Sequence, residues 1–219
     1  MDLEVFTSPH VPRLHWTRIP QPLPDGLARE GRAVLDEEEK ARHGRFRHQR
    51  SADMYLGARL FGKTLLGNIL GVAPEHVRFS YEEGGKPFLK EYPHLYFNLS
   101  HSAGVAAFIS SEEGECGVDV EEIKDRDCLN LARHFFSQDE IEALEEANNQ
   151  GKSSDKMVEL FFEIWTQKEA YLKGTGKGLP GGLKHYTVPR VSGEQGLGEF
   201  TIENFRPYPK IMGAYALPS

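Results

Sequence analysis

Two carboxylates stand at alternate positions of the segment Gly117-Val-Asp-Val-Glu121. Alternate residues of an extended strand share a face, so Asp119 and Glu121 are predicted to point the same way while Val118 and Val120 face a core. Magnesium prefers several oxygen ligands, and a third acid from elsewhere in the chain would complete the protein's share of such a site. An amphipathic strand with an acidic, solvated face is the alternative, and the spacing alone favours it.

A second group of chemically competent side chains falls in the segment Trp165 to Lys173. Helical spacing places Glu169 and Lys173 one turn apart, on a face shared with Trp165. A carboxylate suited to a metal and an ammonium suited to a phosphate would then lie side by side. The alternative is an ordinary surface pair, which contributes about 0.2–0.5 kcal/mol. The glycine-rich run Gly174 to Gly182 either lets a backbone approach a ligand closely or ends the helix in a loop.

The segment Asn98-Leu-Ser-His-Ser102 gathers hydroxyl, imidazole and backbone N–H donors before a glycine turn. Such donors suit a phosphate group, and a strand end with a self-bonded turn is the alternative. A serine hydrolase is disfavoured, because the adjacent residues Ser100 and His101 do not place an imidazole on the neighbouring hydroxyl. The chain also lacks the G-x-S-x-G motif of many hydrolases.

A basic segment runs from Lys40 to Lys63, with seven cations set against the single acid Asp53. It is predicted either to hold a polyanion or to form a solvated helix face that balances the acids at 36–39. The formal net charge of -7 argues against wholesale binding of nucleic acid or anionic membranes. We therefore expect no nucleic-acid partner and no membrane partner.

A mixture of helices and strands must position these groups. Acids at 36–39 followed by apolar residues at helical spacing predict one helix that ends at Gly71. Further helices are predicted from Leu129, from the capping-box spacing Ser137 to Glu140, and over 155–173. Segments rich in β-branched and aromatic residues predict strands at 77–81, 87–89, 96–99, 105–110, 117–121, 186–191, 200–205 and 212–217. Without a strict βαβ alternation, an α+β fold is favoured.

The composition is that of a folded, soluble protein. The 219 residues, 39% of them hydrophobic, can bury a core as one domain or two small lobes. The N-terminus lacks a signal-peptide pattern, and no stretch approaches the roughly 20 apolar residues that span a bilayer. Cys116 and Cys128 are too few for a disulfide framework or a zinc cluster, which suits a reducing compartment. We expect an unprocessed cytoplasmic protein.

Five motifs occur together and in a fixed order: Gly85-Lys-Pro87, Phe97-Asn-Leu-Ser-His-Ser102, Gly117-Val-Asp-Val-Glu121, Phe135-Phe-Ser-x-x-Glu140 and Trp165-Thr-x-Lys-Glu-Ala-x-x-Lys173. The ordered set resembles the Sfp-type 4′-phosphopantetheinyl transferases, in the branch with the Trp and Lys-Glu-Ala form. The resemblance spans roughly 42–178. It implies transfer of the phosphopantetheine arm of coenzyme A to a serine of an apo acyl or peptidyl carrier protein, with Mg²⁺ and with release of adenosine 3′,5′-bisphosphate.

The resemblance also implies an architecture. Two similar α+β lobes would be related by a pseudo-twofold, with coenzyme A in the cleft between them and the chain acting as a monomer. The predicted order of helices and strands agrees with two halves that meet near 105–111. We assign 1–108 to an N-terminal lobe and 109–219 to a C-terminal lobe.

The resemblance carries the following roles, position by position. The Mg²⁺ ligands would be Asp119, Glu121 and Glu169, with Glu121 at the position that other members vary. The contacts to coenzyme A would be Lys173 on the diphosphate, Ser100 and His101 at the 3′-phosphate end, Lys86 beside the adenosine, and Arg42 on the nucleotide phosphates.

The acceptor of the serine proton stays open among Glu169, Glu140 and a metal-bound water. Glu140 is also the last residue of the Ser137 capping box, where its carboxylate would hold a backbone N–H at the helix start. The role of Lys168 is likewise open. A non-catalytic module that binds coenzyme A or a carrier protein is the competing hypothesis, disfavoured because all three acids and Lys173 are present.

Overall fold

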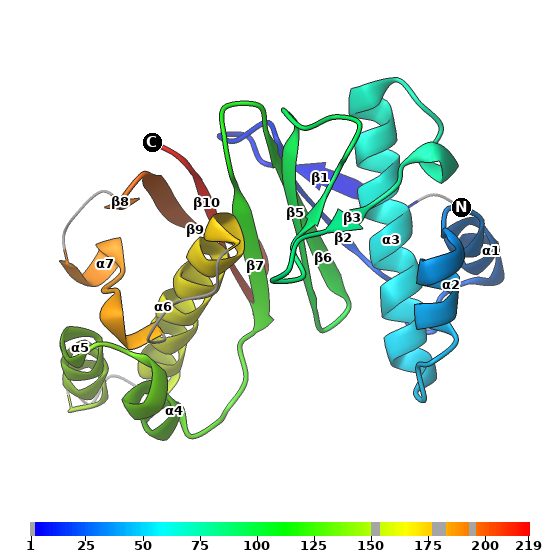
Figure 1. Ribbon diagram of the computed structural model, residues 1–219. Coiled ribbons are helices and arrows are strands. Elements are labelled where there is room, and N and C mark those ends of the chain that lie inside the picture. Colours follow the sequence, from blue (N-terminus) through cyan, green and yellow to red (C-terminus); the bar gives the residue numbers. More distant parts are fainter. Residues whose placement is uncertain (1–2, 150–153, 177–182, 193–195) are drawn as a thin grey trace.

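The computed structural model describes residues 3–149, 154–176, 183–192 and 196–219 (Figure 1). In chain order these residues form β1 (Val5–Thr7), β2 (Leu14–Arg18), α1 (Asp25–Ala33), α2 (Glu37–His43), α3 (Gln49–Leu70), η1 (Pro74–His76), β3 (Ser80–Tyr81), β4 (Pro87–Phe88), β5 (Tyr96–Ser102), β6 (Val105–Ser111), β7 (Gly117–Glu122), α4 (Cys128–Phe135), α5 (Gln138–Asn149), α6 (Ser154–Thr175), η2 (Leu183–His185), α7 (Pro189–Ser192), β8 (Gly196–Leu197), β9 (Phe200–Tyr208) and β10 (Ile211–Pro218).

The strands form two four-stranded antiparallel sheets and a small hairpin. The first sheet has the order β1-β2-β6-β5, the second the order β7-β10-β9-β8, and β3 pairs with β4. In Figure 1 the two sheets lie side by side in the centre, with the 22-residue helix α3 on one flank and the 22-residue helix α6 on the other. Each lobe is thus a sheet covered by a long helix, which confirms the predicted α+β fold of two similar lobes.

The basic segment folds differently from the single helix that the sequence predicted. Asp36 and Glu39 form a capping box that starts α2, and the helix stops at Gly44. The prediction was wrong about continuity because Glu39 is buried and pairs with Lys63 Nζ at 2.5 Å, which requires α2 to fold back against α3. The predicted end of the helix is confirmed, since Gly71 adopts the left-handed conformation with φ 69°.

The two sheets meet along β5 and β7, where side chains replace a backbone ladder. Asn98 Oδ1 accepts the N–H of Val118 at 3.0 Å, and Ser100 Oγ accepts the N–H of Val120 at 3.3 Å. A hydrophobic cluster drawn from both sheets lies beneath this junction; its fully buried members are Leu14, Ala107, Ile109, Cys116 and Val118. The lobes therefore share a core.

Helix α6 approaches β7 so closely that one position must be glycine. A Cβ placed on Gly117 would lie 2.0 Å from the carbonyl oxygen of Ala170 and 2.4 Å from the nitrogen of Gly174. No side chain fits in that space. The close approach brings the last turns of α6, which carry the predicted site residues, directly onto β7.

Two parts of the secondary structure differ from the predictions. The strand predicted at 186–191 is wrong: residues 186–188 connect η2 to α7, and 189–191 belong to α7, which Pro189 begins. The N–H of Val188 is bonded to the side chain of Glu140 instead of to a neighbouring strand. The elements β1, β2 and α1, which precede residue 34, were not predicted. The end of the glycine-rich run, 177–182, lies outside the described residues.

The predicted lobe boundary, between residues 108 and 109, falls inside β6. Strand β6 belongs wholly to the first sheet and β7 to the second. A boundary between residues 108 and 109 would cut β6, so we propose that the lobes are joined in the turn at 112–116.

Candidate active site

The three predicted metal ligands come from two elements of the C-terminal lobe. Asp119 and Glu121 alternate along β7, and Glu169 comes from the facing helix α6. Asp119 is buried, and Glu121 and Glu169 are half-buried. Burial raises the pKa of Glu169, and the charges of Asp119 and Glu121 raise it further. Burial and then Asp119 raise the pKa of Glu121 in the same way. The structure thus brings the three acids into one electrostatically coupled cluster.

A single ammonium group lies against this cluster. Lys173 Nζ is 2.6 Å from Asp119 Oδ1 and donates to Ser100 Oγ at 2.9 Å. Ser100 in turn donates to Asp119 Oδ1 at 3.0 Å. A predicted phosphate contact and a predicted metal ligand therefore hold each other directly, which spacing alone did not indicate.

The cluster has the chemistry of a divalent-cation site, although its ligands are not gathered into a coordination shell. Over the described ranges, no three aspartate, glutamate, histidine or cysteine side chains already surround a common point. Two features fit a cation nonetheless. Asp119 Oδ2 is buried without a hydrogen-bond partner, and three carboxylates face one ammonium, so negative charge is in excess. Hard oxygen donors of this kind suit Mg²⁺.

Arg42 and His101 line one cavity beside the acidic cluster. The cavity has a volume of about 530 Å³. Its lining residues come from α2, α3, the end of β5 and its turn, the end of β7 and the segments that connect these elements: Gln21, Arg42, Phe46, Arg50, Ser51, Met54, Tyr55, His101, Ser102, Ala103, Gly104, Glu122 and Lys124. Its turn is sharp, since Ala103 and Gly104 both have positive φ, at 47° and 79°. The two predicted nucleotide contacts therefore come together, although they are far apart in the sequence.

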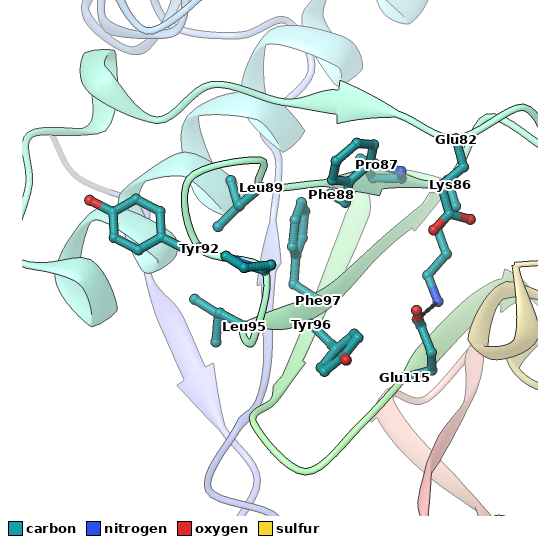
Figure 2. Close-up of a pocket in the computed structure, with 11 residues that line it drawn as sticks. Glu82, Lys86, Pro87, Phe88, Leu89, Tyr92, Leu95, Tyr96, Phe97 and Glu115 are labelled. Carbon is teal, nitrogen blue, oxygen red and sulfur yellow. Dashed lines mark hydrogen bonds and ion pairs between the residues drawn. The ribbon is translucent and has the colours of Figure 1, made fainter.

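Lys86 is occupied by the protein itself. Figure 2 shows its side chain reaching from the β3–β4 hairpin to Glu115, with which it forms an ion pair. Lys86 Nζ also donates to the carbonyl of Gly174 at 2.6 Å and to that of Cys116 at 3.4 Å. The side chain is 8% exposed. The cation thus ties the N-terminal lobe to the end of α6, and it borders a small cavity of about 140 Å³.

Glu140 lies in a closed network away from solvent. Its Oε2 accepts the N–H of Ser137 at 2.8 Å, and Ser137 Oγ accepts the N–H of Glu140 at 3.4 Å, which confirms the capping box. Its Oε1 accepts the N–H of Val188 at 2.8 Å. Lys168 Nζ lies 2.8 Å from Oε2 and donates to the carbonyls of Leu183 and Tyr186. Glu140 has no exposed surface, so this network favours a structural role for it and for Lys168.

Ser102 is the site residue that the sequence reasoning missed. Its Oγ donates to Glu121 Oε2 at 3.0 Å. The segment Asn98-x-Ser-x-Ser102 already carried the signal, because polar residues at period two share a strand face. Ser102 therefore contacts the acidic cluster as Ser100 does, each through one carboxylate of β7.

Comparison with known proteins places both lobes in one family. Residues 115–211 match the family model of the 4′-phosphopantetheinyl transferase superfamily. Residues 21–113 match the model of the 4′-phosphopantetheinyl transferase N-terminal region. The two matches meet in the turn between β6 and β7.

Individual relatives carry the same description. The chain is 37% identical over 154 residues to a putative 4′-phosphopantetheinyl transferase of Synechocystis, covering 69% of this chain and 61% of the relative. It is 35% identical over 170 residues to the 4′-phosphopantetheinyl transferase HetI of Nostoc, covering 76% and 70%. It is 28% identical over 156 residues to the 4′-phosphopantetheinyl transferase Sfp of Bacillus subtilis, covering 71% and 66%. The chain therefore belongs to the 4′-phosphopantetheinyl transferase superfamily.

Proposed function

We propose that this chain is an enzyme that transfers the 4′-phosphopantetheine group of coenzyme A to a serine of a carrier protein, with the acidic cluster holding Mg²⁺. Family membership supplies the reaction. The single observation that supports the metal site is the acidic cluster. Asp119 is paired with Lys173, and the neighbouring carboxyl groups of Glu121 and Glu169 have raised pKa values. Excess negative charge around a buried, unpaired oxygen is what a divalent cation would neutralise.

Asp119, Glu121 and Glu169 are the residues that would hold Mg²⁺. Bound there, the ion would act as a Lewis acid toward the diphosphate of coenzyme A. Lys173 would leave Asp119 for the diphosphate, because a cation on Asp119 removes the reason for the lysine to pair with it. Its ammonium would then stabilise the charge that develops on the departing bisphosphate.

The cavity lined by Arg42 and His101 is the proposed place of the nucleotide phosphates. It opens beside Ser102 and Glu122, next to the acidic cluster, so a diphosphate at the cluster could extend its nucleotide into this cavity. Ser100 is bonded to Lys173 in the cluster, and its chain neighbour His101 lines the cavity. Lys86 is the proposed neighbour of the adenosine, and its ammonium already contacts Glu115 and the carbonyl of Gly174.

Glu169 is the better candidate for the acceptor of the serine proton. Its carboxylate is half-buried in the acidic cluster, beside the place proposed for the diphosphate. The Glu140 carboxylate accepts hydrogen bonds from two backbone N–H groups, pairs with the ammonium of Lys168 and has no exposed surface. A carrier serine would have to break that network to reach it.

The test is a transfer assay read by mass. Protein, coenzyme A, Mg²⁺ and an apo carrier protein are incubated with and without a chelator, and the intact mass of the carrier is measured. Addition of one phosphopantetheine group only in the presence of the metal supports the proposal. Binding of coenzyme A without any mass gain would instead support the non-catalytic module.

The setting of the reaction is also part of the proposal. None of the helices among the described residues is long and apolar enough to cross a bilayer. The two cysteines, both buried thiols, offer no disulfide framework, and we place the reaction in the cytoplasm. We propose that the chain works as a monomer, because each of its two lobes contributes to the one cleft.

A further inference from the structure

Strand β5 presents three polar side chains at alternate positions toward β7. Asn98 and Ser100 accept the backbone N–H groups of Val118 and Val120. The third member, Ser102, reaches a side chain instead, and its Oγ donates to Glu121 Oε2 at 3.0 Å. The lobes are thus joined by a row of side chains from one strand, and the last of them ends on a proposed metal ligand.

The two serines of this row hold the two acids of β7 in parallel. Ser100 donates to Asp119 and Ser102 to Glu121, each at 3.0 Å. The acids belong to the C-terminal lobe and the hydroxyls to the N-terminal lobe. The position of a serine Oγ depends on one torsion, χ1, so a serine on a strand fixes a carboxylate with little disorder of its own.

Glu121 depends on this contact more than Asp119 does. Asp119 also receives Lys173, whereas the described residues give Glu121 one hydrogen-bonding partner, Ser102. A glutamate has several rotatable bonds, and here its charge is repelled by Asp119. Without an anchor its carboxylate would turn toward solvent, and ordering it again would weaken the binding of an ion.

We propose that Ser102 is a positioning residue that fixes Glu121 for the metal ion across the junction of the lobes. The inference rests on the proposed metal site. Hydrogen bonds that orient metal ligands typically change metal affinity about 10- to 100-fold when they are removed. A hydroxyl supplied by the opposite lobe also makes the metal site complete only when β5 and β7 are in register.

Ser102 also lines the cavity proposed for the nucleotide, so a direct contact to coenzyme A is the competing explanation. The two roles differ in what they require. A positioning residue affects metal affinity and leaves metal-free binding of coenzyme A unchanged. A nucleotide contact affects binding of coenzyme A whether or not a metal is present.

The experiment measures Mn²⁺ binding, because Mn²⁺ takes the same oxygen ligands as Mg²⁺ and its free form has an electron paramagnetic resonance signal. The full chain is titrated with Mn²⁺ in the presence of coenzyme A, as wild type, Ser102→Ala and Ser102→Thr. Binding of coenzyme A without metal is measured by calorimetry. Ser110→Ala is the matched control, because Ser110 lies on the neighbouring strand β6, is 1% exposed and has an Oγ without a hydrogen-bond partner among the described residues.

We expect Ser102→Ala to bind Mn²⁺ about 10-fold more weakly than wild type. Ser102→Thr, which keeps the hydroxyl, and Ser110→Ala should bind as wild type does, and all variants should bind coenzyme A equally without metal. If Ser102→Ala bound Mn²⁺ as tightly as wild type, the positioning role of Ser102 would be overturned and the proposed metal site would stand. Weaker metal-free binding of coenzyme A in that variant would reassign Ser102 as a nucleotide contact. Absence of Mn²⁺ binding by the wild type would overturn the proposed metal site itself.

Discussion

Two ionic networks begin at consecutive positions of α6. Lys168 turns to Glu140 and is buried with it: one ammonium faces one carboxylate, and backbone groups supply the remaining hydrogen bonds. Glu169 turns to the cluster of Asp119, Glu121 and Lys173, where three carboxylates face one ammonium. One network is balanced and closed to solvent, whereas the other has excess charge and is partly open.

The difference separates a structural ion pair from a site that binds a ligand. A buried pair is tolerated when each charge and each remaining hydrogen-bonding position is satisfied. The acidic cluster violates that rule, since Asp119 Oδ2 has no partner and the pKa values of Glu121 and Glu169 are raised. Charge repulsion of this kind is what a bound cation would relieve.

The N-terminal lobe holds a third buried network, in which one carboxylate faces two cations. Glu39 is buried against Lys63 at 2.5 Å and Arg59 at 3.0 Å. Part of the basic segment, which the sequence offered as a polyanion site, therefore holds α2 on α3. The cations that stay exposed are Lys40, Arg42, Arg45, Arg47 and Arg50, all toward the start of the segment.

The largest expected effect comes from Asp119→Asn, in the open network. Transfer should fall by on the order of 10³-fold, because a metal ion contributes several kcal/mol to the stabilisation of transition-state charge. The melting temperature of the metal-free protein should change little, because the lost ion pair with Lys173 is offset by the removal of one of three repelling charges. The mass-based transfer assay and thermal denaturation measure the two quantities. Near-normal turnover at limiting Mg²⁺ would contradict the site.

Glu140→Gln, in the closed network, should show the opposite pattern. It leaves Lys168 as an uncompensated buried charge, at a cost of about 3–5 kcal/mol. The melting temperature should fall by roughly 6–20 °C for a chain of this size. Turnover per folded molecule, measured well below that temperature, should stay within a few-fold of wild type.

The matched control for this prediction is Glu146→Gln, an exposed position on the same helix α5. It should leave both stability and turnover unchanged. A loss of turnover by orders of magnitude in Glu140→Gln with little change in melting temperature would identify Glu140 as the proton acceptor and remove the contrast between the two networks.

Much of this contrast was predictable from the sequence, because it depends on local periodicity. Alternation placed Asp119 and Glu121 on one face, the i, i+4 spacing placed Glu169 beside Lys173, and the capping box at Ser137 was identified from its spacing. The resemblance then united the motifs and supplied the two-lobed architecture.

The remainder depends on contacts between distant segments, which spacing cannot show. The pairing of Glu39 with Lys63 broke a helix that looked continuous. The backbone N–H of Val188 is bonded to the Glu140 side chain, so it does not pair with a strand as predicted. The contacts of Lys86 with Glu115 and Gly174 join segments that are distant in the sequence, so they depend on the packing of the two lobes.

Lys86→Met should have a smaller effect on stability, because Lys86 is a cation at the junction of the lobes and belongs to neither network. It removes the ammonium that holds the carbonyl of Gly174, and a hydrogen bond to a charged group contributes about 1.5–3 kcal/mol. The pair with Glu115 adds little, since that carboxylate is 40% exposed. Chemical denaturation measures the loss, with the exposed Lys90→Met as control. Unchanged stability with weaker binding of coenzyme A would make Lys86 a nucleotide contact instead of a tie between lobes.

The smallest expected effect is a pH dependence of the open network. The pKa of Glu169 is raised above its ordinary value of 4.5, so the folded, metal-free protein holds that proton more tightly than the unfolded chain does. The associated stability is fully present below pH 4.5 and is lost as pH rises through the raised pKa. Glu169→Gln does not titrate, so the stability of this variant relative to wild type should increase over that interval. Saturating Mn²⁺ should reverse the trend for wild type, because it binds the deprotonated carboxylate and stabilises the protein increasingly as pH rises. A stability difference between the variant and wild type that does not change with pH would show that the pKa of Glu169 is not raised in the folded protein.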